Sequence, residues 1–171
     1  AVGQLAFKVY HDNKSIFVVN PNEYTERQKH LTHLPAVTLP SVWEAPSPIL
    51  KIAFQEPLDV QQKVLDFIAE RPWRNEYEVV SSADHLLEVT VHGANKGGMV
   101  QKLAELLSIE QRHVYAMGDH ANDIPMLEVA AVPFAPDDCY PDVRAWGPVI
   151  LPPCNDHCVA RLIEILEERY A

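Results

Sequence analysis

Helical and strand-like patterns alternate from Lys96 to the carboxyl terminus, and this alternation limits the fold more than any other feature of the sequence. Such an order predicts an α/β fold, with a parallel, doubly wound sheet between helices. Three strands are few for an independent sheet of this kind, so residues 91–171 are predicted to form only part of a domain. We expect helices at 96–107, 123–129, 142–146 and 159–170, the last capped by Asn155 or Asp156, and strands at 113–117, 132–134 and 149–151.

Residues 1–90 follow a different order of elements. Two hairpin patterns enclose a further strand and a helix that opens at Pro57, an order that suits a small α+β unit. The boundary with the alternating region falls near residues 91–95. The expected strands are 5–10 and 15–20, joined by a turn at 11–14, then 49–55, 77–81 and 85–91; residues 21–48 are expected to be irregular apart from a short helix at 23–30.

The formal net charge of −10 opposes binding to nucleic acid or to an anionic membrane surface. No apolar run approaches the roughly 20 residues that span a bilayer, so no membrane partner is expected. A small phosphorylated metabolite is still a suitable partner, because a bound metal ion and one lysine overcome a negative global field locally.

Three cysteines, Cys139, Cys154 and Cys158, are an odd number and do not suit a disulfide framework. We therefore expect a reducing, cytoplasmic location. The segment from Cys154 to Cys158 also contains His157, but structural zinc normally needs a fourth ligand with recognisable spacing. The segment is interpreted as the start of a helix and not as a metal site.

The run Gly118-Asp119-His120-Ala121-Asn122-Asp123 is the clearest chemical feature. It follows an apolar strand and precedes a helix, and ligand sites of open α/β sheets lie at the carboxyl ends of strands. Two carboxylates and an amide on one loop suit a hard cation such as Mg²⁺ and a phosphate oxygen. Each residue taken singly also suits an ordinary turn or helix cap, so the signal lies in the whole run.

Lys96 begins a predicted helix after the loop that follows strand 85–91. A lysine at such a junction is usually solvated. However, Gly97 and Gly98 follow it, and each glycine costs a helix about 0.5–1 kcal/mol relative to alanine. Glycines here permit other backbone to approach the first turn, and a lysine beside a metal-bound phosphate neutralises the transferring group.

Together, these residues resemble the haloacid dehalogenase superfamily of phosphohydrolases, in particular its Cof-type branch, subclass IIB, with a large α/β cap of the C2 type. The resemblance is strongest over GANKGGMVQKLAELLSI and VYAMGDHANDIPMLEVA. It implies a cap at residues 1–90 and the carboxy-terminal half of a Rossmann-like core at residues 91–171. It also implies Mg²⁺ as cofactor, Asp119 and Asp123 at the metal, Lys96 and Asn122 on the phosphate, and Lys96, Asp119 and Asp123 as the catalytic set, with Asp123 supporting either Lys96 or the metal.

One family motif has no counterpart here. The family's nucleophile lies in Asp-x-Asp-Gly at the end of an apolar strand, and no Asp-x-Asp occurs in the 171 residues. We therefore expect an amino-terminal segment with the nucleophile to be missing, and the chain alone to be inactive. Half a sheet is also expected to expose apolar surface, and so to self-associate or to bind the missing segment.

The function that the resemblance implies is Mg²⁺-dependent hydrolysis of a small phosphomonoester, such as a sugar phosphate, through an aspartyl-phosphate. Two alternatives stay open. The chain could serve binding or regulation without catalysis, which the missing nucleophile favours. The complete protein could instead be a phosphotransferase similar to a phosphosugar mutase.

Overall fold

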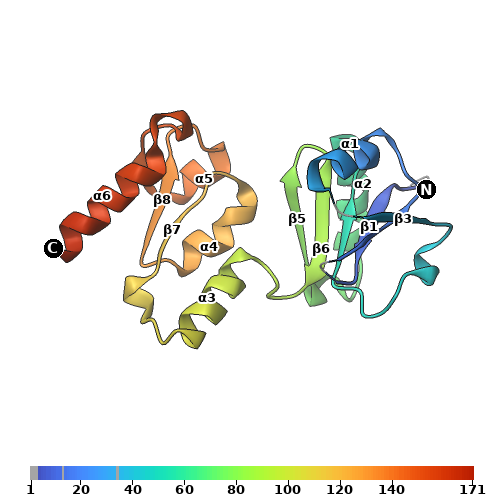
Figure 1. Cartoon of the computed structure of the whole chain (residues 1–171), viewed down its shortest axis with the longest axis horizontal. Coiled ribbons are helices and arrows are strands. Elements are labelled where there is room, and N and C mark those ends of the chain that lie inside the picture. Colours follow the sequence, from blue (N-terminus) through green and yellow to red (C-terminus); the bar gives the residue numbers. More distant parts are fainter. Residues whose placement is uncertain (1–3, 13, 34) are drawn as a thin grey trace. The chain divides into compact units, whose positions relative to one another are not determined.

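The computed structural model of the chain describes residues 4–12, 14–33 and 35–171, so Asn13 in the first predicted turn lies outside the described residues. The chain divides into two compact units, Ala1–His92 and Gly93–Ala171 (Figure 1). The first is mainly an antiparallel sheet with two helices, and the second is a parallel sheet between helices. The expected α/β class is therefore confirmed.

The first unit contains a six-stranded sheet with the order β3-β2-β1-β4-β6-β5. Neighbouring strands run antiparallel, apart from the parallel pair β2 and β3. Both predicted hairpins are confirmed, as β1–β2 and β5–β6. The strands are β1 (Phe7–Tyr10), β2 (Ile16–Val19), β3 (Ala36–Leu39), β4 (Lys51–Phe54), β5 (Tyr77–Ala83) and β6 (Leu86–Val91); the helices are α1 (Glu23–Thr32) and α2 (Leu58–Ala69), with 3₁₀ turns η1 (Val42–Glu44) and η2 (Arg74–Glu76).

Strand β3 is the main departure from the prediction, which treated this part of residues 21–48 as irregular. The strand lies at the edge of the sheet, where it pairs with β2 alone. Pro35 and Pro40 flank it. Proline is tolerated at the ends of strands and along sheet edges, so these prolines delimit the strand and do not prevent it.

Cross-strand register sorts the residues of this sheet onto two faces. On one face, Leu87 is fully buried and packs against Val64 and Ile68 of α2. Phe54 stands directly opposite Leu87, and Phe7 stands opposite Phe54 on the next strand. Residues directly opposite one another share a face, so this face is apolar and forms the main core of the unit.

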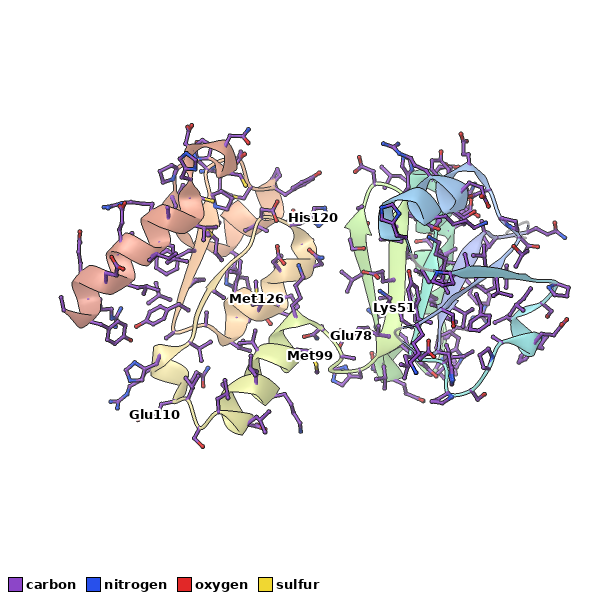
Figure 2. The ribbon with its side chains drawn as sticks, viewed as in Figure 1. Lys51, Glu78, Met99, Glu110, His120 and Met126 are labelled. Atoms are coloured by element: carbon purple, nitrogen blue, oxygen red, sulfur yellow. The ribbon has the colours of Figure 1, made fainter. Side chains whose placement is uncertain are left out.

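The other face of the same sheet is polar over β4, β6 and β5. Tyr10, Lys51, Thr90 and Glu78 are successive cross-strand neighbours in one row. The Lys51 ammonium lies 2.6 Å from a Glu88 carboxylate oxygen and 4.5 Å from the centre of the Tyr10 ring. Figure 2 labels Lys51 and Glu78, whose side chains stand on this face.

The second unit contains a three-stranded parallel sheet with the order β7-β8-β9. Its helices begin close to the predicted positions, and each strand follows a helix or a 3₁₀ turn. The strands are β7 (Tyr115–Met117), β8 (Val132–Pro136) and β9 (Val149–Leu151); the helices are α3 (Lys96–Leu106), α4 (Ile124–Val129), α5 (Pro141–Trp146) and α6 (Cys158–Tyr170), with 3₁₀ turns η3 (Gln111–His113), η4 (Ala121–Asp123) and η5 (Cys154–Asp156).

The two faces of this sheet have separate apolar clusters. Ala116 and Ala135 pack with Leu127 of α4 and Val143 of α5. Their neighbours along each strand point to the opposite face, where Phe134 packs with residues of α6. Helices therefore cover both faces, as predicted for a doubly wound sheet.

The predicted cap of the last helix is wrong. Asn155 and Asp156 lie in the 3₁₀ turn η5, and the residue that caps α6 is His157, which makes no capping hydrogen bond through its side chain. His157 adopts a left-handed conformation with φ 62°. The chain first forms the 3₁₀ turn η5, in which the Asp156 amide donates to the Pro153 carbonyl, and α6 begins after His157.

Helix α3 exposes most of its apolar stripe. The relative exposures are 55% for Met99 and Leu103, 57% for Leu107 and 80% for Leu106. Apolar surface of this kind was expected of half a domain. In the part of the chain that the structure describes, no helix is both long and apolar enough to cross a membrane.

Candidate active site

The candidate site lies where β7 ends and the chain turns into η4 and α4. Gly118 is the first residue after the strand, and its amide donates to the Phe134 carbonyl of β8 across 3.1 Å. A Cβ atom at Gly118 would overlap the side chain of Asp123. Glycine at this position therefore allows the loop to close on Asp123.

Asp123 is the centre of the hydrogen bonds in this loop and is only 4% exposed. Its Oδ1 atom pairs with the Lys96 ammonium. Its Oδ2 atom accepts hydrogen bonds from the amides of Asp119 at 3.0 Å and His120 at 3.3 Å. The carboxylate thus joins the first turn of α3 to the loop after β7, two segments that are 27 residues apart.

These contacts also set the charge of Asp123. Burial by itself raises the pKa of the Asp123 carboxyl, but the hydrogen bond from Lys96, the two backbone amides and the lysine's charge outweigh burial and hold the pKa below its ordinary value. Asp123 is therefore an anion at neutral pH. Lys96, whose side chain is 50% exposed, keeps part of its surface available for a ligand.

The first turn of α3 explains the pair of glycines. The Asn95 side chain caps the helix by accepting a hydrogen bond from the Gly98 amide at 2.9 Å. A Cβ atom on Gly97 would overlap the Pro125 carbonyl of α4, and one on Gly98 would overlap the Gly93 carbonyl. Gly97 thus lets α3 and α4 pack closely, and Gly98 lets the loop before α3 approach the first turn of the helix.

Asp119 and Asn122 occupy the same loop with different surroundings. The Asp119 side chain is exposed, and no ion pair to it occurs among the described residues. Its carbonyl accepts a hydrogen bond from the Tyr140 amide at 2.8 Å. The Asn122 Oδ1 atom is buried and has no hydrogen-bond partner within the described part of the chain.

Other residues around the loop differ in how clearly the sequence indicated them. The His120 ring packs edge-on against the Tyr140 ring at 4.4 Å and 63° (His120 is labelled in Figure 2). Asn95 has a recognisable cap pattern, a short polar residue before a helix. Tyr140 has none, because its amide reaches Asp119 from the loop after a different strand. His92, which lies four residues before Lys96, pairs with Glu78 at 2.9 Å in the first unit.

The loop contains part of what a magnesium ion requires. Mg²⁺ commonly binds one or two protein carboxylates and takes its other ligands from water and substrate phosphates. The exposed Asp119 carboxylate fits that role, whereas Lys96 and two amides already engage the Asp123 carboxylate. No cluster of three or more His, Cys, Asp or Glu side chains in the described residues is arranged to hold a metal ion.

Comparison with known proteins identifies the family to which the chain belongs. The profile of the haloacid dehalogenase-like hydrolase family matches residues 3–163, which is nearly the whole chain. The chain belongs to the haloacid dehalogenase-like hydrolases.

Among curated relatives, this family member is 30% identical to the putative phosphatase YxeH of Bacillus subtilis over 161 residues, which cover 92% of the chain and 59% of YxeH. It is 34% identical over 114 residues to YcsE of the same organism, a 5-amino-6-(5-phospho-D-ribitylamino)uracil phosphatase, covering 62% of the chain and 45% of YcsE. The chain thus spans about half the length of these relatives.

Solved structures share the fold. SMU.1108c from Streptococcus mutans matches 96% of this chain and 62% of its own with a TM-score of 0.81 at 18% identity. The subclass IIB sugar phosphatase BT4131 matches 95% of this chain and 61% of its own with a TM-score of 0.77 at 19% identity.

Proposed function

We propose that the second unit supplies one half of the active site of a Mg²⁺-dependent phosphatase that hydrolyses a small phosphomonoester. The observation that carries this proposal is the Lys96–Asp123 pair, which lies beside the exposed Asp119 at the carboxyl end of β7. The buried Asp123 carboxylate holds the Lys96 side chain, half of whose surface is exposed. The point charge of a lysine ammonium suits a phosphate group. The match to phosphatases supports the same reading.

Each residue has a role in this proposal. Lys96 binds a phosphate oxygen and offsets the charge of the transferring group, and Asp123 positions Lys96 and the two loop amides. Asp119 is the direct carboxylate ligand of Mg²⁺, with the charge of Asp123 close behind it. Asn122 orients the phosphate through its side-chain Nδ2 atom, which can donate a hydrogen bond to a phosphate oxygen. The metal ion, when bound, polarises the phosphoryl group.

The nucleophile is proposed to come from sequence outside these 171 residues, because no Asp-x-Asp occurs in them. Residues 91–171 then form the carboxy-terminal half of the catalytic core, and residues 1–90 form its cap. A cap that closes over the site excludes water and selects the leaving group. The names of YcsE and BT4131 favour a phosphorylated sugar or polyol as substrate.

The exposed stripe of α3 is proposed to be covered in the working protein. Four large apolar side chains on one helix favour burial against further polypeptide. Sedimentation of the isolated chain at micromolar concentration shows whether the covering polypeptide is a second copy of the chain or other sequence of the same protein. A dimer indicates self-association, whereas a monomer that binds a hydrophobic dye indicates a surface reserved for other sequence of the same protein.

A chimera tests the activity. The matched part of this chain replaces the corresponding part of YxeH, and release of free phosphate from phosphomonoesters is measured with Mg²⁺. We expect turnover, reduced about 100-fold or more by Lys96→Ala or Asp119→Ala. Lys102→Ala, an exposed lysine on the same helix, is the matched control and should leave the rate unchanged.

Two other results would redirect the proposal. A chimera that melts cooperatively but neither releases nor transfers phosphate indicates a binding protein. Transfer to a second hydroxyl without free phosphate indicates a phosphotransferase. The 171-residue chain itself is expected to show no hydrolysis above background, since covalent catalysis needs the absent nucleophile.

A further inference from the structure

Tyr140 contacts the loop after β7 from the loop that follows the neighbouring strand β8. It is the residue immediately before α5, whose first residue is Pro141. Its amide donates to the Asp119 carbonyl at 2.8 Å, and its ring packs edge-on against the His120 ring with the ring centres 4.4 Å apart. Tyr140 therefore contacts two successive residues of the loop, one through its backbone and the other through its side chain.

The two peptide groups that flank the Asp119 Cα atom are both held by hydrogen bonds. On the amino side, the Asp119 amide donates to Asp123 Oδ2 at 3.0 Å. On the carboxyl side, the Asp119 carbonyl accepts from the Tyr140 amide, and the His120 amide of the same peptide group donates to Asp123 Oδ2 at 3.3 Å. Because peptide groups are planar, a residue has only two soft backbone dihedrals. Holding both groups fixes the direction of the Asp119 Cα–Cβ bond.

The neighbours of Tyr140 in sequence anchor it to the core of the second unit. Cys139 and the fully buried Val143 belong to the apolar cluster beneath α4 and α5, and the Cys139 amide donates to the Pro136 carbonyl at 3.1 Å. The Tyr140 side chain itself is 50% exposed. Its ring is therefore not a core residue, and its contact with His120 lies at the surface of the loop.

We propose that Tyr140 is a positioning residue for Asp119, which holds the Asp119–His120 peptide group so that the Asp119 carboxylate keeps one orientation when it binds Mg²⁺. This inference rests on the proposed function, in which Asp119 is the direct ligand of the metal ion. The Asp119 side chain is exposed, and no ion pair within the described ranges restrains it, so its backbone sets its direction. Mg²⁺ demands near-ideal octahedral geometry, and a carboxylate on a loosened loop binds it less tightly.

Three substitutions at this one position separate the two contacts. Tyr140→Phe keeps both the ring and the amide, and Tyr140→Ala keeps the amide alone. Tyr140→Pro removes both, and the fixed φ of proline, about −65°, agrees with the observed φ of −62°. Trp146→Ala is the matched control, because Trp146 is an exposed aromatic residue at the other end of α5.

The first measurement is amide hydrogen exchange of the 171-residue chain, with neither metal nor substrate present. We expect the His120 amide to exchange about threefold to tenfold faster in Tyr140→Ala, because the ring contact restrains its peptide group. Exchange should be faster still in Tyr140→Pro, which also loses the hydrogen bond, whereas Tyr140→Phe and Trp146→Ala should match the unchanged chain. Equal exchange in all four variants would overturn the proposal, and so would a uniform rise that includes α6, since Tyr140 would then act on stability alone.

The second measurement uses the chimera with YxeH. We expect the Mg²⁺ concentration that gives half the maximal rate to rise about threefold to tenfold in Tyr140→Ala and to return to its original value in Tyr140→Phe. The KM for the phosphomonoester and the kcat at saturating Mg²⁺ should each stay within about twofold. A lower kcat with an unchanged requirement for Mg²⁺ would contradict the positioning role. An inactive chimera would count against the proposed function alone, because the exchange measurement tests the hold on the loop without any activity.

Discussion

The two units differ in where their apolar residues end up. In the first unit, the central strands contain apolar side chains with no exposed surface, namely Val9, Val18 and Leu87. In the second, α3 exposes Leu106 at 80% although its sequence has the pattern of a buried stripe. The first sheet is completed by its own hairpins, whereas the second has three parallel strands, and parallel sheets are normally covered on both faces. An apolar stripe therefore predicts burial against something, but not whether the partner is within the same chain.

The largest expected change in stability comes from one of two leucine substitutions that test this difference. Leu87→Ala should destabilise the first unit by about 2–5 kcal/mol, because it opens a cavity in an enclosed core. Leu106→Ala should change the stability of the isolated chain by less than about 0.5 kcal/mol, since its side chain is mostly in solvent. Amide hydrogen exchange of β6 and α3 measures both. A large loss from Leu106→Ala would show that α3 is already covered, for example in a dimer.

A glycine substitution tests the contact that the second unit does make. Gly97→Ala should destabilise the packing of α3 on α4 by about 1–3 kcal/mol, because the new methyl overlaps the Pro125 carbonyl. Gly147→Ala is the matched control: nothing lies within 4 Å of its Cβ position, so only the cost of its φ of +84° is felt. Local exchange rates in α3 should rise for Gly97→Ala alone.

The ion pairs of the two units should also differ. Asp123→Ala removes a nearly buried carboxylate that accepts three hydrogen bonds, and should cost about 1–3 kcal/mol of unfolding free energy. Asp59→Ala removes the partner of Lys63 in the first unit, where the two side chains are 72% and 60% exposed. That change should cost less than about 1 kcal/mol. Urea unfolding of the two variants measures both losses of unfolding free energy. Equal losses would contradict the conclusion that Asp123 is the centre of the hydrogen bonds in its loop.

The smallest effect is a dependence on pH. Because the folded pKa of Asp123 lies below its ordinary value of 3.8, the carboxylate contributes stability above that value and loses it as pH falls through the folded pKa. Exchange rates in α3 and the loop after β7 should therefore rise as the pH falls below that ordinary value. Asp123→Asn should flatten this part of the profile, and an unchanged slope would mean that other carboxyls set it.

Local patterns in the sequence determined most of the elements. Alternating apolar residues located both hairpins, and the order of helix and strand after Lys96 predicted the doubly wound sheet. The strand, loop and helix around Gly118-Asp119-His120-Ala121-Asn122-Asp123 were also predicted, since residue spacing and turn chemistry act over only a few positions. The two glycines after Lys96 indicated a close backbone approach, and the structure supplies the carbonyls that they accommodate.

Contacts between distant segments were decided only by the tertiary structure. The sequence predicted that Asp123 supports either Lys96 or the metal. In the structure, the packing of α3 against α4 brings the Lys96 ammonium to the Asp123 carboxylate. No local sequence pattern predicts that the Tyr140 amide donates a hydrogen bond to the Asp119 carbonyl, or that His157 adopts a left-handed conformation before α6. The physical reason is common to all three. A hydrogen bond or a strained dihedral is worth about 1–3 kcal/mol, and which one forms depends on how the strands and helices around it are already packed.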